Sequence, residues 1–594
     1  MRFVKFASVV LLAAFAGITP LRAADAGGDL TRLLRDYREG IRTLNTAIDP
    51  ERGDKNSTDA YDAAEIAKYL TARRQLNQNL SGRLLAIPTE RLSPSDLLSY
   101  EIFRWDLEDE GAELAPGVAE RFWLLPLNQF DGRHLSFARE MQYRTDTPLD
   151  EAKDYDRAIT RMIGFTRWLD SAIVRMRAGI AEGVVQPRII VERMIAETEP
   201  FAAGAPDDGV FMGPLRKMPE SLAEEDRARI APAYREAVDG ALVPAYRRLA
   251  DFLKNEYLPA SRSSAGLSGM PGGRQMYLYL VKDETTEEMK PEAIHAFGLS
   301  EIKRIEAAME IVKKETGFTG SLDAFRQFLR TDPRFKFKDS DAMMAEFNRV
   351  RDAAEMRLSS VISLKPRSKL TFRFLEDFAA PYRPAAEYRG GNGSRAGIVY
   401  LNNSDLPSRL TFTSEALQMH EGLPGHHLQV ALAAENRSLP RFRRFGGETA
   451  FTEGWGLYAE SLGPELGLLT DPYQKFGALS FDAWRSARLV IDTGIHWMGW
   501  SRERAIQFLT AHTTLSQGEA SEEVERYIAI PGQALAYKIG EQKFLSLRAR
   551  AKQALGDKFD LKRFHDAVLK DGAMPLPILD AKMQRWIEQE KSAS

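Results

Sequence analysis

The sequence predicts a large, mainly α-helical protein with a small β-sheet. Long segments in both halves of the chain repeat apolar residues at three- and four-residue spacing, which is typical of helices with one buried face. Segments rich in β-branched and aromatic residues are few and short. Of the 594 residues, 44% are hydrophobic. That is enough for a large core, in one big domain or in roughly two to four ordinary ones.

Residues 1–23 have the pattern of a signal peptide. Arg2 and Lys5 form a charged start, the apolar stretch VVLLAAFAGI follows, and Leu21-Arg22-Ala23 is a suitable cleavage site. The mature chain would then start near Ala24. The apolar stretch is too short to favour a membrane span, and no later segment is a candidate for one. We therefore expect a periplasmic or secreted protein; the alternative is an uncleaved N-terminal anchor.

The composition argues against several classes of function. The net charge of −3 gives no indication of binding to nucleic acid or to an anionic membrane. The chain has no cysteine, so it offers no disulfide, no thiol nucleophile and no cysteine for lipid attachment. A serine hydrolase is disfavoured because no GxSxG motif is present. Nothing in the composition indicates an oligomeric state.

Residues 24–265 are predicted to form an N-terminal helical lobe, and residues 266–594 a catalytic lobe, the two packed into one unit. Pro- and Gly-rich joints lie at 198–216 and 259–274, and the second of them marks the proposed boundary. The segment MYLYLVK, residues 276–282, predicts a short strand. Helices are expected next at 290–316 and 339–360.

The region 368–413 predicts a small sheet. Its segments KLTFRFLED, AGIVYLNN and RLTFTS are rich in β-branched and aromatic residues and are separated by turn sequences such as RGGNGSR. An exposed edge strand at this place could hold an extended peptide by backbone hydrogen bonds; the alternative is a sheet that only packs. Helices are predicted for the rest of the chain at 448–463, 473–493, 501–512, 518–530, 533–555, 560–570 and 577–591.

The stretch SEALQMHEGLPGHHLQ, residues 414–429, predicts a metal site. It holds three of the eight histidines, His420, His426 and His427, and Glu421 directly follows the first of them. A second acidic helical segment, FTEGWGLYAE, lies about thirty residues further on. A His-Glu pair, another His and a Glu on a following helix are the components of a zinc hydrolase.

The spacing departs from the HExxH pattern, in which the second His follows the first by four residues. Here that position is Pro424. In a regular helix His426 would lie about 120° around the axis from His420, and His427 about 10 Å along it. The GLPG segment breaks the helix, and we expect it to form a bulge that returns the second His to the first. His426 is the preferred second ligand and His427 the alternative.

Five blocks of the sequence resemble a known family: HEGLPGHHLQ, FTEGWGLYAE, RLVIDTGIHWMGW, ERYIAIPGQALAYKIG and FHDAVLKDGAMPL. They are similar to the successive blocks of the bacterial family catalogued as domain of unknown function 885, which is grouped with the gluzincin metallopeptidases. The family is similar in outline to the helical M3, M32 and angiotensin-converting-type peptidases. The resemblance therefore implies a zincin-like peptidase fold with a long central groove, a small sheet beside the metal helix and one zinc ion per chain.

The resemblance implies a role for each residue of the motif. His420 and His426 would be neutral imidazole ligands, and Glu453 the third ligand, on the next helix. Three protein ligands leave a fourth position for water, the arrangement of a catalytic zinc. Glu421 would be the general base, which takes a proton from water and passes it to the leaving amine. Manganese or cobalt could replace zinc in such a site.

Two further glutamates remain open as ligands or as supporting residues. Glu460 lies seven residues after Glu453 on one helical face, so periodicity does not decide which of them binds the metal. The other would then orient a ligand histidine from behind. Glu448 is a further candidate for this supporting role.

Other residues are candidates for the groove. Tyr537 lies in a block that resembles the oxyanion-stabilising helix of angiotensin-converting-type enzymes, so it would donate a hydrogen bond to the oxyanion; the alternative is a packed Tyr. His565 is a second catalytic candidate, or a buried His near a helix end. Arg526 could bind a substrate carboxylate or bridge helices. Tyr400 and Asn402, near the end of a predicted strand, could contact substrate.

Three functional hypotheses follow from the sequence. The first is a periplasmic or secreted zinc peptidase that acts on peptides or peptide-like substrates. The sequence does not distinguish an endopeptidase from an exopeptidase. The second is a zinc-dependent hydrolase of another amide or ester, such as a cell-wall fragment. The third is a helical binding protein without catalysis. The intact Glu421 argues against the third, because a purely structural metal site needs no carboxylate beside its ligand.

Overall fold

The computed structural model describes residues 25–48, 63–130, 132–142, 149–204, 206–207, 209–375, 384–391 and 395–592. The predicted signal peptide, residues 1–23, lies outside these ranges. Within them the chain is mainly α-helical with one three-stranded sheet, which confirms the predicted fold class. In the same part of the chain, no helix combines the length and apolarity that crossing a membrane requires.

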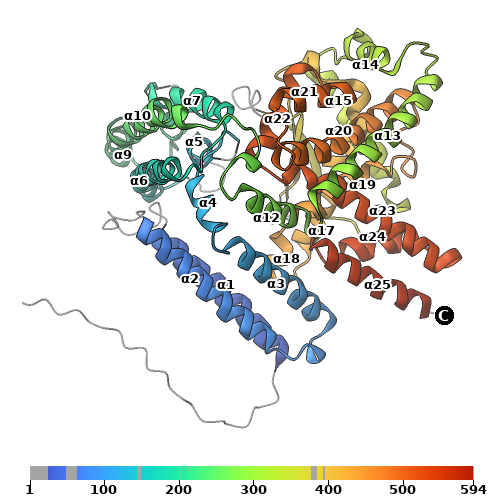
Figure 1. The fold of residues 1–594 in the computed structure, drawn as a ribbon, viewed down its shortest axis with the longest axis horizontal. Helices are drawn as coiled ribbons and strands as arrows, with labels where there is room; N and C mark the ends of the chain where they lie inside the picture. The colour runs from blue at the N-terminus through green and yellow to red at the C-terminus, as the bar shows by residue number, and fades with distance from the viewer. Residues whose placement is uncertain are drawn as a thin grey trace, which may run out of the picture.

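The N-terminal part of the chain is a series of helices at one side of the molecule (Figure 1). Helices α1 and α2 lie side by side and pack on α3, which starts after the N-capping Ser93 with Pro94 in its first position. The helices that follow enclose a hydrophobic core of their own, which extends onto C-terminal helices. The bounds are α1 Ala26–Ile48, α2 Ala63–Leu85, α3 Pro94–Glu113, α4 Ala119–Leu124, α5 Arg133–Gln142, α6 Ala152–Glu182, α7 Arg188–Ala202, α8 Gly213–Arg216, α9 Glu224–Ala237, α10 Val243–Phe252 and α11 Leu258–Ala260.

The middle of the chain continues as helices α12 Gly273–Thr285, α13 Pro291–Glu315, α14 Leu322–Thr331 and α15 Ser340–Arg357. The strand predicted at 276–282 is therefore wrong, because these residues form most of α12. Its buried side chains include Met276, Tyr277 and Val281, which repeat at helical spacing. A short apolar and aromatic run fits a buried strand and a buried helix equally well, and here packing on neighbouring helices decided.

The sheet consists of β1 Leu370–Phe374, β2 Ala386–Arg389 and β3 Gly397–Leu401, in the order β1-β3-β2. Strand β1 runs parallel to β3, and β2 runs antiparallel to it, so β2 is an edge strand. The predicted strands KLTFRFLED and AGIVYLNN correspond to β1 and β3. The third predicted strand, RLTFTS, is wrong, because Thr411–Thr413 form a 3-10 turn that leads into the next helix. The short, charged β2 was not predicted.

The C-terminal part is helical, as predicted, with helix ends shifted by a few residues. Long helix α20 packs along α13, and α19 packs along α23 (Figure 1). The bounds are α16 Ser414–Glu421, α17 His426–Glu435, α18 Arg441–Phe445, α19 Thr449–Glu460, α20 Pro472–His496, α21 Arg502–His512, α22 Gln517–Ala529, α23 Ala536–Leu555, α24 Leu561–Leu569 and α25 Leu576–Ser592.

Close contact between α19 and α23 depends on two glycines. A Cβ atom on Gly454 would lie 2.4 Å from the Cα atom of Gly540, and a Cβ atom on Gly540 would lie 2.0 Å from the carbonyl oxygen of Ala450. Larger residues would push the helices apart. This contact matters for function, because α19 and α23 carry residues of the candidate site.

The hydrophobic core crosses the predicted boundary at residue 265. Leu98 and Val184 share one cluster with Tyr277 and Trp455, and Tyr246 shares another with Val490. Each of these two clusters therefore contains side chains from both predicted lobes. The division at residue 265 stays a prediction.

Candidate metal site

The two helices that carry the predicted ligands are separated by a break, not by a bulge inside one helix. Helix α16 ends at Glu421 and α17 begins at His426. The link is held by the indole of Trp455 on α19, whose Nε1 donates a hydrogen bond to the carbonyl oxygen of Pro424 at 2.9 Å. It turns sharply at Gly425, where a Cβ atom would lie 2.0 Å from the carbonyl oxygen of His420.

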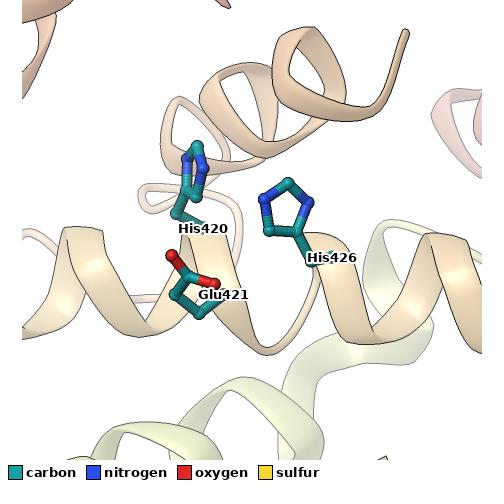
Figure 2. A group of neighbouring side chains, drawn as sticks. All are labelled: His420, Glu421 and His426. Carbon is teal, nitrogen blue, oxygen red and sulfur yellow. The ribbon is translucent and has the colours of Figure 1, made fainter. Parts of the chain in front are cut away.

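The break brings His420 and His426 together. Their ring centroids are 4.6 Å apart, and donor atoms of His420, Glu421 and His426 lie within 4.8 Å of one another. Figure 2 shows His420 and Glu421 at the end of one helix and His426 at the start of the next, with the side chains on the same side of the break. These three side chains thus offer ligand atoms close enough together to hold a single ion.

Glu453, on α19, completes the cluster. Its Oε2 atom lies 3.4 Å from Nε2 of His420 and 3.4 Å from Nε2 of His426. These distances exceed the usual 2.9–3.0 Å of a hydrogen bond between nitrogen and oxygen. Two ligand atoms that are each about 2.0–2.1 Å from a tetrahedral ion are about 3.3–3.4 Å apart. The three side chains therefore fit the spacing of a tetrahedral metal site.

Glu460, also on α19, lies behind His420. Its Oε1 is 2.8 Å from Nδ1 of His420, so that nitrogen donates to the carboxylate and Nε2 is turned to Glu453. Gly456 makes room for the ring, because a Cβ atom there would lie 2.7 Å from Cε1 of His420. A carboxylate that holds the far nitrogen of an imidazole is the usual support of a metal-binding histidine.

The charges of the cluster favour a cation. Burial alone would lower the pKa of His420, but hydrogen bonds to Glu453 and Glu460 raise it to about 10. Burial likewise opposes the charge of Glu453, yet the two histidines hold the pKa of its carboxyl well below the usual range. Burial raises the pKa of Glu421 above its ordinary value, against the opposing effect of His426 and His420. A positive charge at His420 is thus stabilised by the carboxylates of Glu453 and Glu460.

His427 is turned away from the cluster. Its Nδ1 accepts a hydrogen bond from the hydroxyl of Tyr388 at 3.1 Å, and its Nε2 donates to the carbonyl oxygen of Ser368 at 3.1 Å. Burial lowers its pKa to about 4. Both ring nitrogens therefore have partners outside the site, and the structure brings His426, not His427, to His420.

A cavity of about 730 Å³ opens in front of the cluster. Its floor includes His420, Glu421, His426 and Glu453. One part of its wall is edge strand β2 with the residues just before it, and another part consists of side chains from α20, α22 and α23. The polar and aromatic side chains of the lining include Glu387, Asn402, Asp405, Arg409, Trp484, Arg485, Arg488, Glu519, Glu522, Glu523, Arg526 and Tyr537.

Of the residues predicted to line the groove, Tyr537, Arg526 and Asn402 line the cavity that the structure describes and Tyr400 does not. Tyr537 lines the cavity, with its ring centroid 6.5 Å from that of His420 and its hydroxyl 3.4 Å from Nη2 of Arg526. Arg526 and Asn402 also line it. Tyr400 is not part of the lining that the structure describes; its ring lies 4.9 Å from the guanidinium carbon of Arg389 on the sheet. The substrate-binding role of Tyr400 stays a prediction.

His565 lies away from the cavity. Its Nε2 accepts a hydrogen bond from the hydroxyl of Tyr458 at 2.7 Å, and its Nδ1 donates to the carbonyl oxygen of Val361 at 2.7 Å. Burial lowers its pKa to about 3, so the ring is neutral at physiological pH. It ties α24 to α19 in the core. These contacts favour the alternative of a buried structural His, and the catalytic role stays a prediction.

Glu448 does not support a ligand histidine either; it belongs to a group of partly buried carboxylates. Burial, together with Asp106, Asp283, Asp109 and Glu284, raises the pKa of Glu448 to about 8. Burial and other neighbouring carboxylates raise the pKa of Asp283 to about 8 and that of Asp106 to about 7. These groups belong to α12, to α3 and to the residue before α19.

Replacing Glu448 by Gln is expected to stabilise the protein at alkaline pH only. A carboxyl with a raised folded-state pKa contributes stability that is complete below its unfolded pKa of about 4. That contribution is lost as the pH rises through about 8. The apparent Tm of Glu448→Gln should therefore exceed that of wild type by roughly 1–3 °C at pH 8.5, and match it at pH 5. Equal shifts at both pH values, or a shift in the exposed control Glu355→Gln, would contradict this origin.

The arginines of α20 were missed in the sequence. Arg485 and Arg488 lie in the block DAWRSARLV, among buried Ala483, Ala487 and Leu489. Two charged residues three positions apart on an otherwise apolar face are a signal that could have singled them out. Neither forms part of a motif with metal-ligand spacing, and only the fold places them at the cavity.

Comparisons with known proteins agree with the fold. The model of a family described as "Bacterial protein of unknown function (DUF885)" matches residues 47–583. The crystal structure of a "putative lipoprotein" from Colwellia psychrerythraea is 25% identical, with a TM-score of 0.84 over 95% of this chain and 99% of that one. A second, a "putative lipoprotein of unknown function" from Shewanella oneidensis, is 17% identical, with a TM-score of 0.71 over 95% and 100%. A search of curated proteins gave no match.

Proposed function

Because this chain belongs to the bacterial family of unknown function DUF885, whose description assigns no activity, we propose from the site itself that it is a zinc-dependent peptidase. One observation carries the proposal. The Oε2 atom of Glu453 lies 3.4 Å from Nε2 of both His420 and His426, with Glu421 in the same cluster. Two His, one Glu and an adjacent free carboxylate are the donor set of a catalytic zinc site.

The donor set favours zinc over harder cations. Imidazole and carboxylate ligands in a tetrahedral arrangement suit Zn²⁺, whereas Mg²⁺ and Ca²⁺ prefer oxygen ligands alone. His420, His426 and Glu453 would hold the ion, and Glu460 would keep Nε2 of His420 turned toward it through the bond at Nδ1. Zinc in this position would supply Lewis-acid polarisation of the scissile carbonyl and of the attacking water.

The remaining residues of the cluster account for the proton transfers. Glu421 takes a proton from the attacking water as the new C–O bond forms at the scissile carbonyl. It then gives this proton to the amine nitrogen as the C–N bond breaks, so that one water is consumed and one acid and one amine are formed. Tyr537 faces the same cavity and is placed to donate a hydrogen bond to the oxyanion.

Strand β2 supports a peptide as the substrate. It is an edge of the sheet, and Ala386, Glu387 and Tyr388 line the cavity in front of the cluster. An extended peptide can add to such an edge through backbone hydrogen bonds, which leaves its side chains to the walls. A compact ester or a small amide would make no use of this strand.

We place the protein outside the cytoplasm. The N-terminal pattern of a signal peptide predicts export. The two similar structures are described as those of "putative lipoproteins", and lipoproteins are a class of envelope proteins. This chain has no cysteine to carry a lipid, so a periplasmic or secreted form fits it better than an anchored one.

Metal analysis with a peptide screen tests the proposal. Purified protein supplied with zinc and then dialysed is expected to hold about one zinc per chain, and to cleave members of a synthetic peptide library that mass spectrometry then identifies. A chelator should abolish cleavage and added zinc should restore it. If the protein binds no zinc and cleaves no peptide, the peptidase proposal is wrong and the hypothesis of a binding protein is favoured.

A further inference from the structure

Three guanidinium groups line one wall of the cavity. Arg485 and Arg488 project from α20 and Arg526 from α22. The ring of Trp484 is near both of the first two, 4.9 Å from the guanidinium carbon of Arg485 and 4.8 Å from that of Arg488. The ring of Tyr537 lies 4.3 Å from the guanidinium carbon of Arg488. Aromatic faces fix the planes of these cations without using their N–H donors.

Arg485 is buried without a matching acceptor. The residue is 5% exposed, and in the part of the chain that the structure describes it donates no hydrogen bond; its buried Nε and Nη1 have no partner there. The carboxylate nearest to it is Glu460, at 3.9 Å from Nη2, and the same Oε1 atom already accepts a hydrogen bond from His420. A buried guanidinium without acceptors is costly, so a position of this kind indicates a ligand that supplies them.

The neighbouring arginines are also incompletely neutralised. Arg488 and Arg526 share one carboxylate, that of Glu523, at 3.2 and 3.8 Å. Arg488 is 3% exposed and its Nη1 has no partner among the described residues. Three further carboxylates of the cavity, Asp405, Glu519 and Glu522, act on Arg409, and the charge of Arg485 acts on Glu421. The lining carboxylate paired with these guanidinium groups is therefore that of Glu523, which two of them share.

The wall is within reach of the bond that would be cleaved. Nη2 of Arg485 lies 3.9 Å from the Glu460 oxygen that also binds Nδ1 of His420. The guanidinium carbon of Arg488 lies 4.3 Å from the ring of Tyr537, whose centroid is 6.5 Å from that of His420. Successive Cα atoms of a peptide are 3.8 Å apart. A substrate whose scissile carbonyl lies at the cluster can therefore place a carboxylate on the arginines one or two residues further along.

We propose that Arg485, together with Arg488 and Arg526, binds a substrate carboxylate one or two residues beyond the scissile bond, so that the protein removes short pieces from the C-terminal end of peptides. The inference rests on the proposed peptidase function and names its substrate class. Planar guanidinium groups suit a carboxylate, which can accept two parallel hydrogen bonds. The carboxylate is either the free C-terminus or an acidic side chain near it, and the two share this chemistry.

Paired peptide libraries test the inference. One library of tripeptides has free C-terminal carboxylates, the second has the same sequences as C-terminal amides, and the third is amidated with Asp or Glu at the last position. Wild type supplied with zinc should cleave the free set with a kcat/KM about 10- to 100-fold higher than the amidated set. A preference for the third set over the second would assign the site to an acidic side chain, which also supports carboxylate binding.

A second readout does not depend on cleavage. The zinc-loaded variant Glu421→Gln is immobilised, each library is passed over it, and the retained peptides are identified by mass spectrometry. Free carboxylates should be retained in preference to amides. In Arg485→Gln the preference should fall to within about twofold in both assays, with zinc content unchanged, and Arg485→Lys should restore part of it.

Two controls make the result decisive. Arg248→Gln, at a surface arginine that pairs with Asp170, should keep the full preference. If Arg485→Gln does not fold by circular dichroism, Arg488→Gln takes its place. Free and amidated peptides cleaved equally well by wild type, or an unchanged preference in Arg485→Gln, would overturn the carboxylate site and leave the peptidase intact. Libraries that are neither cleaved nor retained in the presence of zinc would instead reject the peptidase itself.

Discussion

Replacing Glu421 by Gln is expected to lower peptide hydrolysis by about 100- to 10,000-fold while zinc stays bound. The amide keeps the size of the side chain and leaves His420, His426 and Glu453 in place, but it cannot take a proton from water or return it to the leaving amine. Initial rates on a peptide found by the library screen, with zinc measured by elemental analysis on the same sample, check both halves of the expectation.

The matched control for this variant is Glu355→Gln, at an exposed position on α15. It removes the same charge from the protein and should leave both the rate and the zinc content unchanged. If Glu421→Gln hydrolyses peptides at nearly the wild-type rate, Glu421 is not the general base. Loss of zinc together with activity would make it a ligand, which the position of Glu421 next to both histidines also allows.

Replacing His426 by Ala should reduce bound zinc from about one per chain to below about 0.1 after dialysis, whereas His427→Ala should retain it. His426 faces Glu453 across 3.4 Å, while both nitrogens of His427 are engaged by Tyr388 and Ser368. Elemental analysis of the two variants, purified in parallel, measures the difference.

The effects of the two variants on stability are expected in the reverse order: His427→Ala should destabilise the metal-free protein more than His426→Ala. His427→Ala removes two buried hydrogen bonds and should lower the free energy of unfolding by about 2–3 kcal/mol, whereas His426→Ala removes a side chain whose Nδ1 has no partner in the described part of the chain. Denaturant titration of the metal-free proteins checks this. If His426→Ala keeps its zinc and His427→Ala loses it, then His427 is the ligand and His426 is not.

Helical segments with a regular apolar face were predictable, and short segments without one were not. The helices after residue 448 follow the pattern closely, because each buries a stripe at helical spacing. Residues 276–282 and 409–414 were predicted as strands from composition alone. The first is helix and the second a turn, because short apolar runs carry no periodicity and take the structure that their neighbours allow.

The sequence by itself determined the helical class, the cluster of His420, Glu421 and His426 around a helix-breaking GLPG segment, and the family. It left Glu453 and Glu460 undecided, since both lie on one face of α19. The tertiary structure places the ring of His420 between them, with Nε2 toward Glu453 and Nδ1 toward Glu460. Periodicity states which face of a helix is buried, but only the packing of α16, α19 and α20 decides what that face meets. For the same reason Arg485 became visible as a site residue only in the fold.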